Sequence, residues 1–275
     1  MWIAFSAWFC LVFDAGSAEI ATEAAACTVR AMGGLTEAER YAFDIQGYLV
    51  RRHALGAAEV AALNAAVDAL RVPPAAESIQ SQRFSAHLAS SPAFVALLDH
   101  PAVFDVVVEL CGPAMRLDHA YGIVMTAGTS GLGLHGGATP FDPAQFYIVN
   151  NGRISCGLVA VQWALVDHRP GDGGFCCVPG SHKAAFPLPA AAPPSLAVEV
   201  PLAAGDVVLF TEALVHGTLP WRGPHDRRTL LYKYSPGNSS WGKDETLPAE
   251  LAPLLSERQR LLFEPPYVAY RRPVT

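Results

Sequence analysis

The second half of the chain is a succession of short apolar runs separated by turn residues, and this pattern constrains the fold most. Strand-like runs are expected at 115–126, 154–166, 174–178, 196–200, 206–210, 213–218 and 228–235. Asn150, Asn151 and Gly152 form a strong hairpin-turn signal just before the second of these runs. Several short strands with this punctuation predict a β-sandwich or β-barrel.

The first half of the chain is predominantly helical in pattern. Thr36 and Glu39 form a capping box that predicts a short helix to Phe43. A short strand is expected at 48–50, a loop up to His87, and further helices at 57–71, 92–98, 101–110 and 248–263. Helices that precede strands without regular alternation argue against a parallel βαβ fold. We therefore expect a mainly β fold, a jelly roll with flanking helices, in one domain over 35–275.

Residues 1–34 are set apart as an N-terminal extension. Residues 1–13 are almost entirely apolar, and the small residues near Gly16 and Ala18 would suit a signal-peptidase cut. No Lys or Arg precedes the apolar run, however, and a secretory signal normally has one. The secretory signal is therefore weak, and a variable extension or an incorrectly assigned start remains the alternative.

Composition narrows the class of protein. Hydrophobic residues make up 51% of the chain and the net charge is −6, which excludes a disordered chain and argues against nucleic-acid binding. No run reaches the roughly 20 apolar residues of a membrane span. The six cysteines show no CxxC pair and no regular framework, so we expect a reducing compartment, cytoplasmic or organellar.

Two histidines stand where a jelly roll could bring distant strand ends together. His135 lies in a long connection just after a strand, and His216 lies near the end of a later pair of strands. Imidazole nitrogens suit iron, zinc, copper or nickel. Two histidines alone are weak support for a metal site, because most histidines in proteins are surface or packed core residues.

Three sequence blocks make the chain resemble the phytanoyl-CoA dioxygenase family of Fe(II)/2-oxoglutarate-dependent oxygenases. They are FDIQGYLV at 43–50, the segment 165–183 that ends in PGSHK, and the block 205–230 with GDVVLF, His216-Gly217-Thr218 and Arg227. The resemblance covers roughly 35–240. It implies a double-stranded β-helix, which is a cupin-like jelly roll, and it agrees with the strand pattern.

The resemblance also implies site residues. His135 and His216 stand where the two iron-binding histidines stand, and Arg227 matches the arginine that holds the distal carboxylate of 2-oxoglutarate. An Arg fork can grip a carboxylate with two parallel hydrogen bonds. Neighbouring Arg228 should point to the other face of its strand, so we favour Arg227. Thr218 matches a small hydroxyl residue near the cosubstrate.

The chain departs from the family at the third iron ligand. The family motif is His-x-Asp, and here the third position is Gly137, which has no side chain to ligate. Asp142 is the nearest carboxylate in the loop that could take this place. Alternatively the vacancy admits halide, as in the related iron halogenases, which have Ala or Gly there. As a third alternative, the protein has lost iron chemistry and only binds.

The function that these residues imply is oxidation of a small or lipid-like metabolite. Fe(II), 2-oxoglutarate and O2 would be required, and succinate and CO2 would be the coproducts of hydroxylation. A halogenase and a non-catalytic jelly-roll binding protein are the alternatives. Four other histidines, His119, His168, His182 and His225, are expected to pack or face solvent.

Overall fold

The computed structural model describes residues 34–72, 81–190, 194–243 and 247–275. The apolar segment 1–13, with Cys10 and Cys27 and the rest of the expected extension through residue 33, lies outside the described residues. None of the helices in the described part of the chain combines the length and hydropathy needed to span a bilayer.

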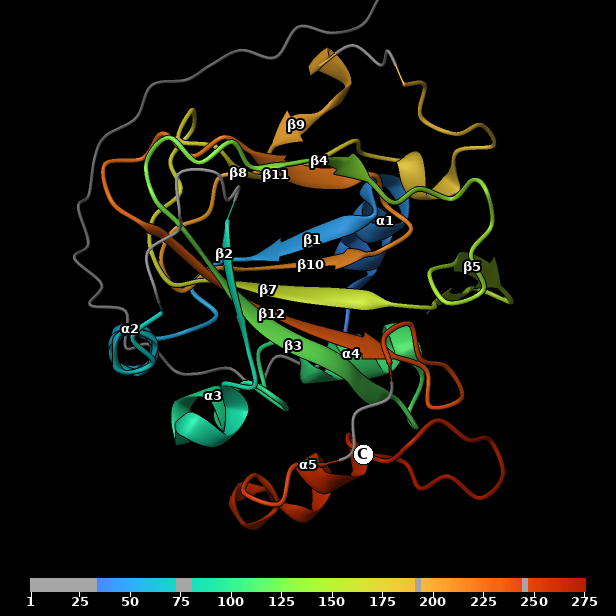
Figure 1. Ribbon diagram of the computed structural model, residues 1–275. Helices are drawn as coiled ribbons and strands as arrows, with labels where there is room; N and C mark the ends of the chain where they lie inside the picture. The colour runs from blue at the N-terminus through green and yellow to red at the C-terminus, as the bar shows by residue number, and fades with distance from the viewer. Residues whose placement is uncertain (1–33, 73–80, 191–193, 244–246) are drawn as a thin grey trace, which may run out of the picture. The chain divides into compact units, whose positions relative to one another are not determined.

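Two antiparallel sheets form the jelly roll (Figure 1). The larger, six-stranded sheet has the order β1 (Tyr48–Arg51), β10 (Val207–Thr211), β7 (Val159–Ala164), β12 (Arg227–Ser235), β3 (Arg116–Met125) and β2 (Gln82–Ser85). The smaller sheet has the order β4 (Leu132–His135), β11 (His216–Leu219), β8 (Gly174–Cys177) and β9 (Val198–Glu199). Strands that are far apart in sequence are therefore neighbours, as the expected jelly roll requires.

The helices contribute to an apolar core on one face of the larger sheet. The α-helices are α1 (Glu37–Gln46), α2 (Ala57–Ala69), α3 (Pro92–Ala96), α4 (Phe104–Cys111) and α5 (Glu257–Leu261), and the 3-10 turns are Leu88–Ser90, Ser181–Lys183, Pro194–Leu196 and Ala252–Leu254. The capping box at Thr36 is present and starts α1, which continues three residues past the expected end at Phe43. Residues of α1 to α5 share one buried cluster with the larger sheet.

Alternation along the strands separates two cores. On β7, Val161 and Trp163 face the cluster shared with the helices, whereas Ala160 and Ala164 face a second cluster that includes Phe175 of the smaller sheet. Successive side chains of a strand point to opposite faces. The larger sheet is therefore covered on both sides, and its inner face forms one wall of the space between the sheets.

Several expected elements differ in extent. The expected strand 154–166 is two strands, β6 (Arg153–Cys156) and β7, with Gly157 between them. At Gly157 the carbonyl of Ala144 passes too close for a Cβ. The hairpin turn at Asn151–Gly152 is confirmed, and it joins β5 (Tyr147–Asn150) to β6. The connection before it contains β4, and the stretch before His87 contains β2. The expected C-terminal helix 248–263 is shorter, with only α5 and one 3-10 turn.

His87 predicts an acid-sensitive stability. It is 1% exposed and packs edge-to-face against Phe84, Phe94 and Tyr232, and its burial lowers its pKa to about 4. An unfolded histidine titrates near pH 6.5, so the unfolded chain binds the extra proton between about pH 6.5 and 4. The stabilising contribution of neutral His87 is therefore complete above pH 6.5 and is lost as the pH falls towards 4.

We expect the free energy of unfolding of His87→Gln to fall less steeply than that of the wild type between pH 6.5 and 4. The two slopes should differ by up to about 1.4 kcal/mol per pH unit. Denaturant titrations at several pH values measure this slope. An unchanged slope in the variant would contradict the assignment to His87.

Candidate iron and 2-oxoglutarate site

The two expected metal-binding histidines lie side by side in the smaller sheet. His135 ends β4 and His216 begins β11, and the two residues are direct cross-strand partners. Their ring centroids are 4.3 Å apart. Antiparallel pairing of two strand ends that are 81 positions apart in the sequence therefore brings both imidazoles to one point at the edge of the space between the sheets.

Each imidazole is oriented by the backbone carbonyl two residues before it. His135 Nδ1 donates to the carbonyl of Gly133 at 2.9 Å, and His216 Nδ1 donates to the carbonyl of Leu214 at 2.7 Å. A neutral imidazole that carries its proton on Nδ1 has a free lone pair on Nε2. Metal-binding histidines commonly have this arrangement. Burial lowers the pKa of His216 to about 4, which keeps this ring neutral at physiological pH.

Aromatic side chains enclose His216 from the inner side. The ring centroid of Phe210 lies 4.8 Å from that of His216, and the ring centroid of Phe175 lies 6.3 Å away. Both phenylalanines belong to the apolar cluster between the sheets. His216 itself is only 6% exposed, whereas His135 is exposed, so the pair has one dry side and one side open to solvent.

A carboxylate also reaches this pair. Glu212 lies in the turn between β10 and β11 and is 4% exposed, with Oε2 at 3.8 Å from His216 Nε2. Its Oε1 lies 2.8 Å from Nζ of Lys233. The sequence pattern does not single out Glu212. The one signal that could have indicated it is an acidic residue in the otherwise apolar and buried segment between two strands.

Arg227 and Arg228 point to opposite faces of β12, as the strand alternation predicts. Arg228 pairs with Asp68 of α2 at 2.8 Å and donates to Asn64. Arg227 is 1% exposed, and its one hydrogen bond goes to the Met125 sulfur at 3.4 Å. Its Nε has no partner, and no acidic side chain in the described ranges pairs with it. Burial lowers the pKa of Arg227 to about 10, so the guanidinium stays charged.

Thr218 and Gly174 connect the histidine pair with Arg227. Thr218 lies two residues after His216 on the same face of β11, about 7 Å further along the strand. Gly174 pairs with Leu219, and a Cβ on this glycine would come within 3.1 Å of Arg227 Nε. Glycine at 174 therefore leaves room for the Arg227 side chain against β8, the strand that pairs with β11.

The expected third ligand is not preassembled. Nowhere in the described ranges do three His, Cys, Asp or Glu side chains already stand at metal-binding spacing. Asp142 is partly buried, and its carboxylate accepts a hydrogen bond from Ala144 N at 2.7 Å, which closes a local turn. A ligand role for Asp142 stays a prediction.

The remaining histidines are packed or peripheral. His182 is buried and its Nε2 contacts the carbonyl of Asp44 at 3.0 Å, and His119 stacks between Tyr121 and Trp241. His168 is 1% exposed and packs against Trp221, whereas His225 is exposed. These placements agree with the expectation that these histidines pack or face solvent.

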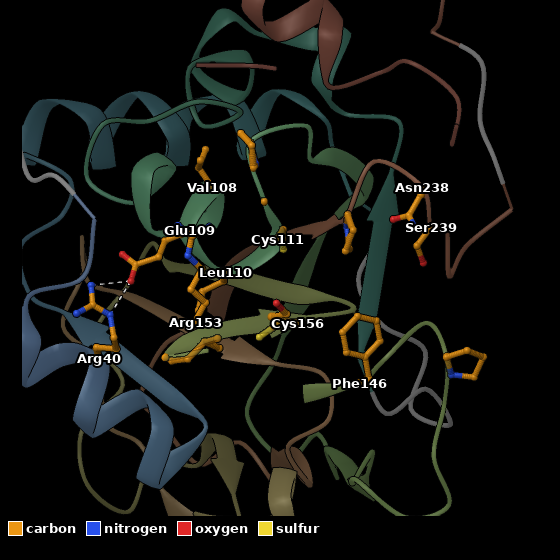
Figure 2. Close-up of a pocket in the computed structure, with 17 residues that line it drawn as sticks. Arg40, Val108, Glu109, Leu110, Cys111, Phe146, Arg153, Cys156, Asn238 and Ser239 are labelled. Carbon is orange, nitrogen blue, oxygen red and sulfur yellow. Dashed lines mark hydrogen bonds and ion pairs between the residues drawn. The ribbon is translucent and has the colours of Figure 1, made fainter. Parts of the chain in front are cut away.

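A separate cleft of about 770 Å³ is bounded by α4, β6 and the segment after β12 (Figure 2). The Arg40–Glu109 ion pair lies on one side, and Asn238 and Ser239 lie on the other. Burial raises the pKa of the Cys156 thiol in its wall to about 12, so this thiol stays protonated. Neither His135, His216 nor Arg227 lines this cleft, so it is separate from the candidate iron and 2-oxoglutarate site.

The family to which the chain belongs agrees with this geometry. Residues 43–229, more than half of the chain, match the phytanoyl-CoA dioxygenase (PhyH) family. The chain therefore belongs to this family, and its class is that of the Fe(II)/2-oxoglutarate-dependent dioxygenases. Iron and 2-oxoglutarate are the metal and cosubstrate of this class.

Solved structures show the same fold. HygX from Streptomyces hygroscopicus with nickel and 2-oxoglutarate bound shares 29% identity, with a TM-score of 0.69 over 79% of this chain and 94% of HygX. HygX with nickel, 2-oxoglutarate and hygromycin B bound shares 28% identity, with a TM-score of 0.68 over the same shares. SnoN, an α-ketoglutarate-dependent epimerase from nogalamycin biosynthesis, shares 22% identity and a TM-score of 0.59 over 74% of this chain and 83% of SnoN, which supports the fold alone. No curated protein matches the chain in sequence.

Proposed function

We propose that the chain oxidises a C–H bond of a small molecule, with iron held by His135 and His216 and 2-oxoglutarate held by Arg227 and Thr218. The observation that carries the proposal is the buried Arg227 guanidinium, which has no acidic partner in the described structure and lies beside Gly174 of β8, the strand that pairs with the strand of His216. A buried cation without a counter-ion is strongly unfavourable, so this position fits a ligand carboxylate.

Each residue then has a definite task. His135 and His216 direct Nε2 to the metal because backbone carbonyls hold their Nδ1 atoms. Arg227 grips the distal carboxylate, and the Thr218 hydroxyl donates to the same group. Phe175 and Phe210 exclude water from the inner side of His216. When bound, iron and 2-oxoglutarate activate O2, with oxidative decarboxylation to succinate and CO2 coupled to substrate hydroxylation.

A pocket of about 290 Å³ suggests the size of the substrate. Arg83, His119, Tyr121, Trp241 and Lys243 are among its lining residues. His135, His216 and Arg227 do not line this pocket; Lys233 lies between it and Glu212, with Nζ 5.7 Å from the centroid of the Tyr121 ring and 2.8 Å from Glu212. The volume lies at the lower end of the roughly 300–1,000 Å³ typical of ligand sites. Aromatic faces with two flanking cations favour a compact metabolite that carries an anionic or hydrogen-bond-accepting group over a long lipid.

Succinate formation tests the proposed function. The purified chain, supplied with Fe(II), 2-oxoglutarate and O2, should release succinate slowly without substrate and faster with the correct one. A metal chelator should stop the release. If the chain binds 2-oxoglutarate but releases no succinate over a broad panel of small anionic metabolites, the non-catalytic binding function is correct instead.

A further inference from the structure

The two glycines after His135 are required by the backbone, which removes this segment as a source of a third ligand. Gly136 has φ +82° and Gly137 has φ +119°, a region that favours glycine. A Cβ on Gly136 would lie 2.7 Å from the Leu214 carbonyl and 2.8 Å from the Glu212 carbonyl. The glycine pair therefore lets β4 leave the sheet directly against the turn that carries Glu212.

Glu212 is the carboxylate that this close approach brings to the histidines. It lies four residues before His216, with Oε2 at 3.8 Å from His216 Nε2. This is the ring nitrogen that is not hydrogen-bonded to the Leu214 carbonyl. Two donors that share a first-row metal at about 2.1 Å each, at an angle near 90°, lie about 3 Å apart. A side-chain movement of about 1 Å therefore brings Glu212 to ligand distance.

The charges around Glu212 suit a ligand. Glu212 is 4% exposed, and two nitrogen groups face its carboxylate: His216 Nε2 lies 3.8 Å from Oε2 and Lys233 Nζ lies 2.8 Å from Oε1. Lys233 Nζ therefore faces Oε1, whereas Oε2 is the oxygen that faces His216. Metal-binding carboxylates commonly have such an outer partner.

We propose that Glu212 is the third protein ligand of the iron, so that a 2-His-1-carboxylate site is completed from the β10–β11 turn. This inference rests on the proposed function, because it presupposes that His135 and His216 bind the metal. It also assigns the position that Gly137 leaves vacant to a protein carboxylate and not to halide, and it selects Glu212 over Asp142.

Binding of Co(II), a spectroscopic substitute for Fe(II), tests the inference without turnover. We expect Glu212→Gln to weaken Co(II) binding to the full-length chain by at least about 100-fold, more than the roughly 10–100-fold cost of losing an outer partner. Its visible Co(II) spectrum should also change, because a ligand is lost. Glu212→Asp keeps the charge beside Lys233 but shortens the ligand, and it should bind Co(II) more tightly than Glu212→Gln.

Three comparisons make the result specific. Glu109→Gln is the matched control, since Glu109 pairs with Arg40 at the distant cleft, and its Co(II) affinity should equal that of the wild type. Asp142→Asn should also bind Co(II) within about threefold of the wild type, because a turn hydrogen bond accounts for Asp142. Thermal unfolding of the metal-free variants shows whether Glu212→Gln is folded, and Glu212→Asp serves if it is not.

The outcomes separate the two proposals. If the wild type binds no Co(II), the proposed function fails and this inference fails with it. If the wild type binds Co(II) and His216→Ala does not, but both Glu212 variants bind within threefold of the wild type, only the role of Glu212 is overturned. If chloride changes the Co(II) spectra of the wild type and of Glu212→Gln alike, and Glu212→Gln binds Co(II) within threefold of the wild type, the role of Glu212 is overturned in favour of a halide site.

Discussion

Replacing Arg227 by methionine is expected to weaken 2-oxoglutarate binding by at least about 100-fold, or about 3 kcal/mol. Methionine keeps much of the side-chain volume but removes the two parallel hydrogen bonds and the charge that a carboxylate needs. Arg227 is buried and has no acidic partner in the described structure, so methionine breaks no ion pair there. The unfolding temperature of the cosubstrate-free protein should therefore stay the same or rise.

Arg228→Met is the matched control for this prediction. Its guanidinium pairs with Asp68 and donates a hydrogen bond to Asn64 on the helix-covered face of β12. We expect its dissociation constant for 2-oxoglutarate to stay within about threefold of the wild type, since exposed ion pairs contribute little. Titration with 2-oxoglutarate under anaerobic conditions measures both variants. A larger loss for Arg228→Met than for Arg227→Met would reverse the assignment.

Replacing His216 by alanine is expected to have the largest effect on activity. The variant loses one of the two nitrogen ligands, and the wall that Phe175 and Phe210 form around the ring then faces a cavity. Removing a directly acting group commonly lowers turnover by 10³-fold or more, so we expect succinate formation to fall by at least about 10³-fold. Metal binding, measured independently, should fall in parallel.

His182→Gln is the appropriate control for His216→Ala. His182 is also buried and its pKa is also lowered to about 4 by burial, but it contacts the Asp44 carbonyl and Tyr147 and not the histidine pair. Its substitution should lower the unfolding temperature while the metal affinity remains that of the wild type. Equal loss of metal binding in both variants would show that general destabilisation explains the result for His216.

Much of the fold follows from local patterns in the sequence. Short apolar runs separated by turn residues predicted the jelly roll, and the capping box at Thr36 predicted the first helix, because these signals act over a few residues. Differences arose where a distant segment decides the local conformation. At Gly157, directly after β6, the Ala144 carbonyl approaches too closely for a side chain, and in the tail an α-helix forms only at Glu257–Leu261.

Only the part of the candidate site that local patterns encode could be predicted from the sequence. Strand alternation separates Arg227 from Arg228, and of these two arginines only Arg227 lacks an acidic partner in the described ranges. Glu212 could not be found in this way. Its proximity to His216 depends on the turn between β10 and β11, and its proximity to His135 depends on the pairing of β4 with β11. No local pattern encodes these two contacts together.

The visible spectrum of the anaerobic protein with Fe(II) is the most direct test of the histidine and arginine assignments. Addition of 2-oxoglutarate should produce a charge-transfer band, because the cosubstrate chelates iron that the protein holds. The band should be absent in His216→Ala, and in Arg227→Met it should appear only at 2-oxoglutarate concentrations at least about 100-fold higher. A wild-type protein that gives no band at saturating Fe(II) and 2-oxoglutarate would contradict the proposed site.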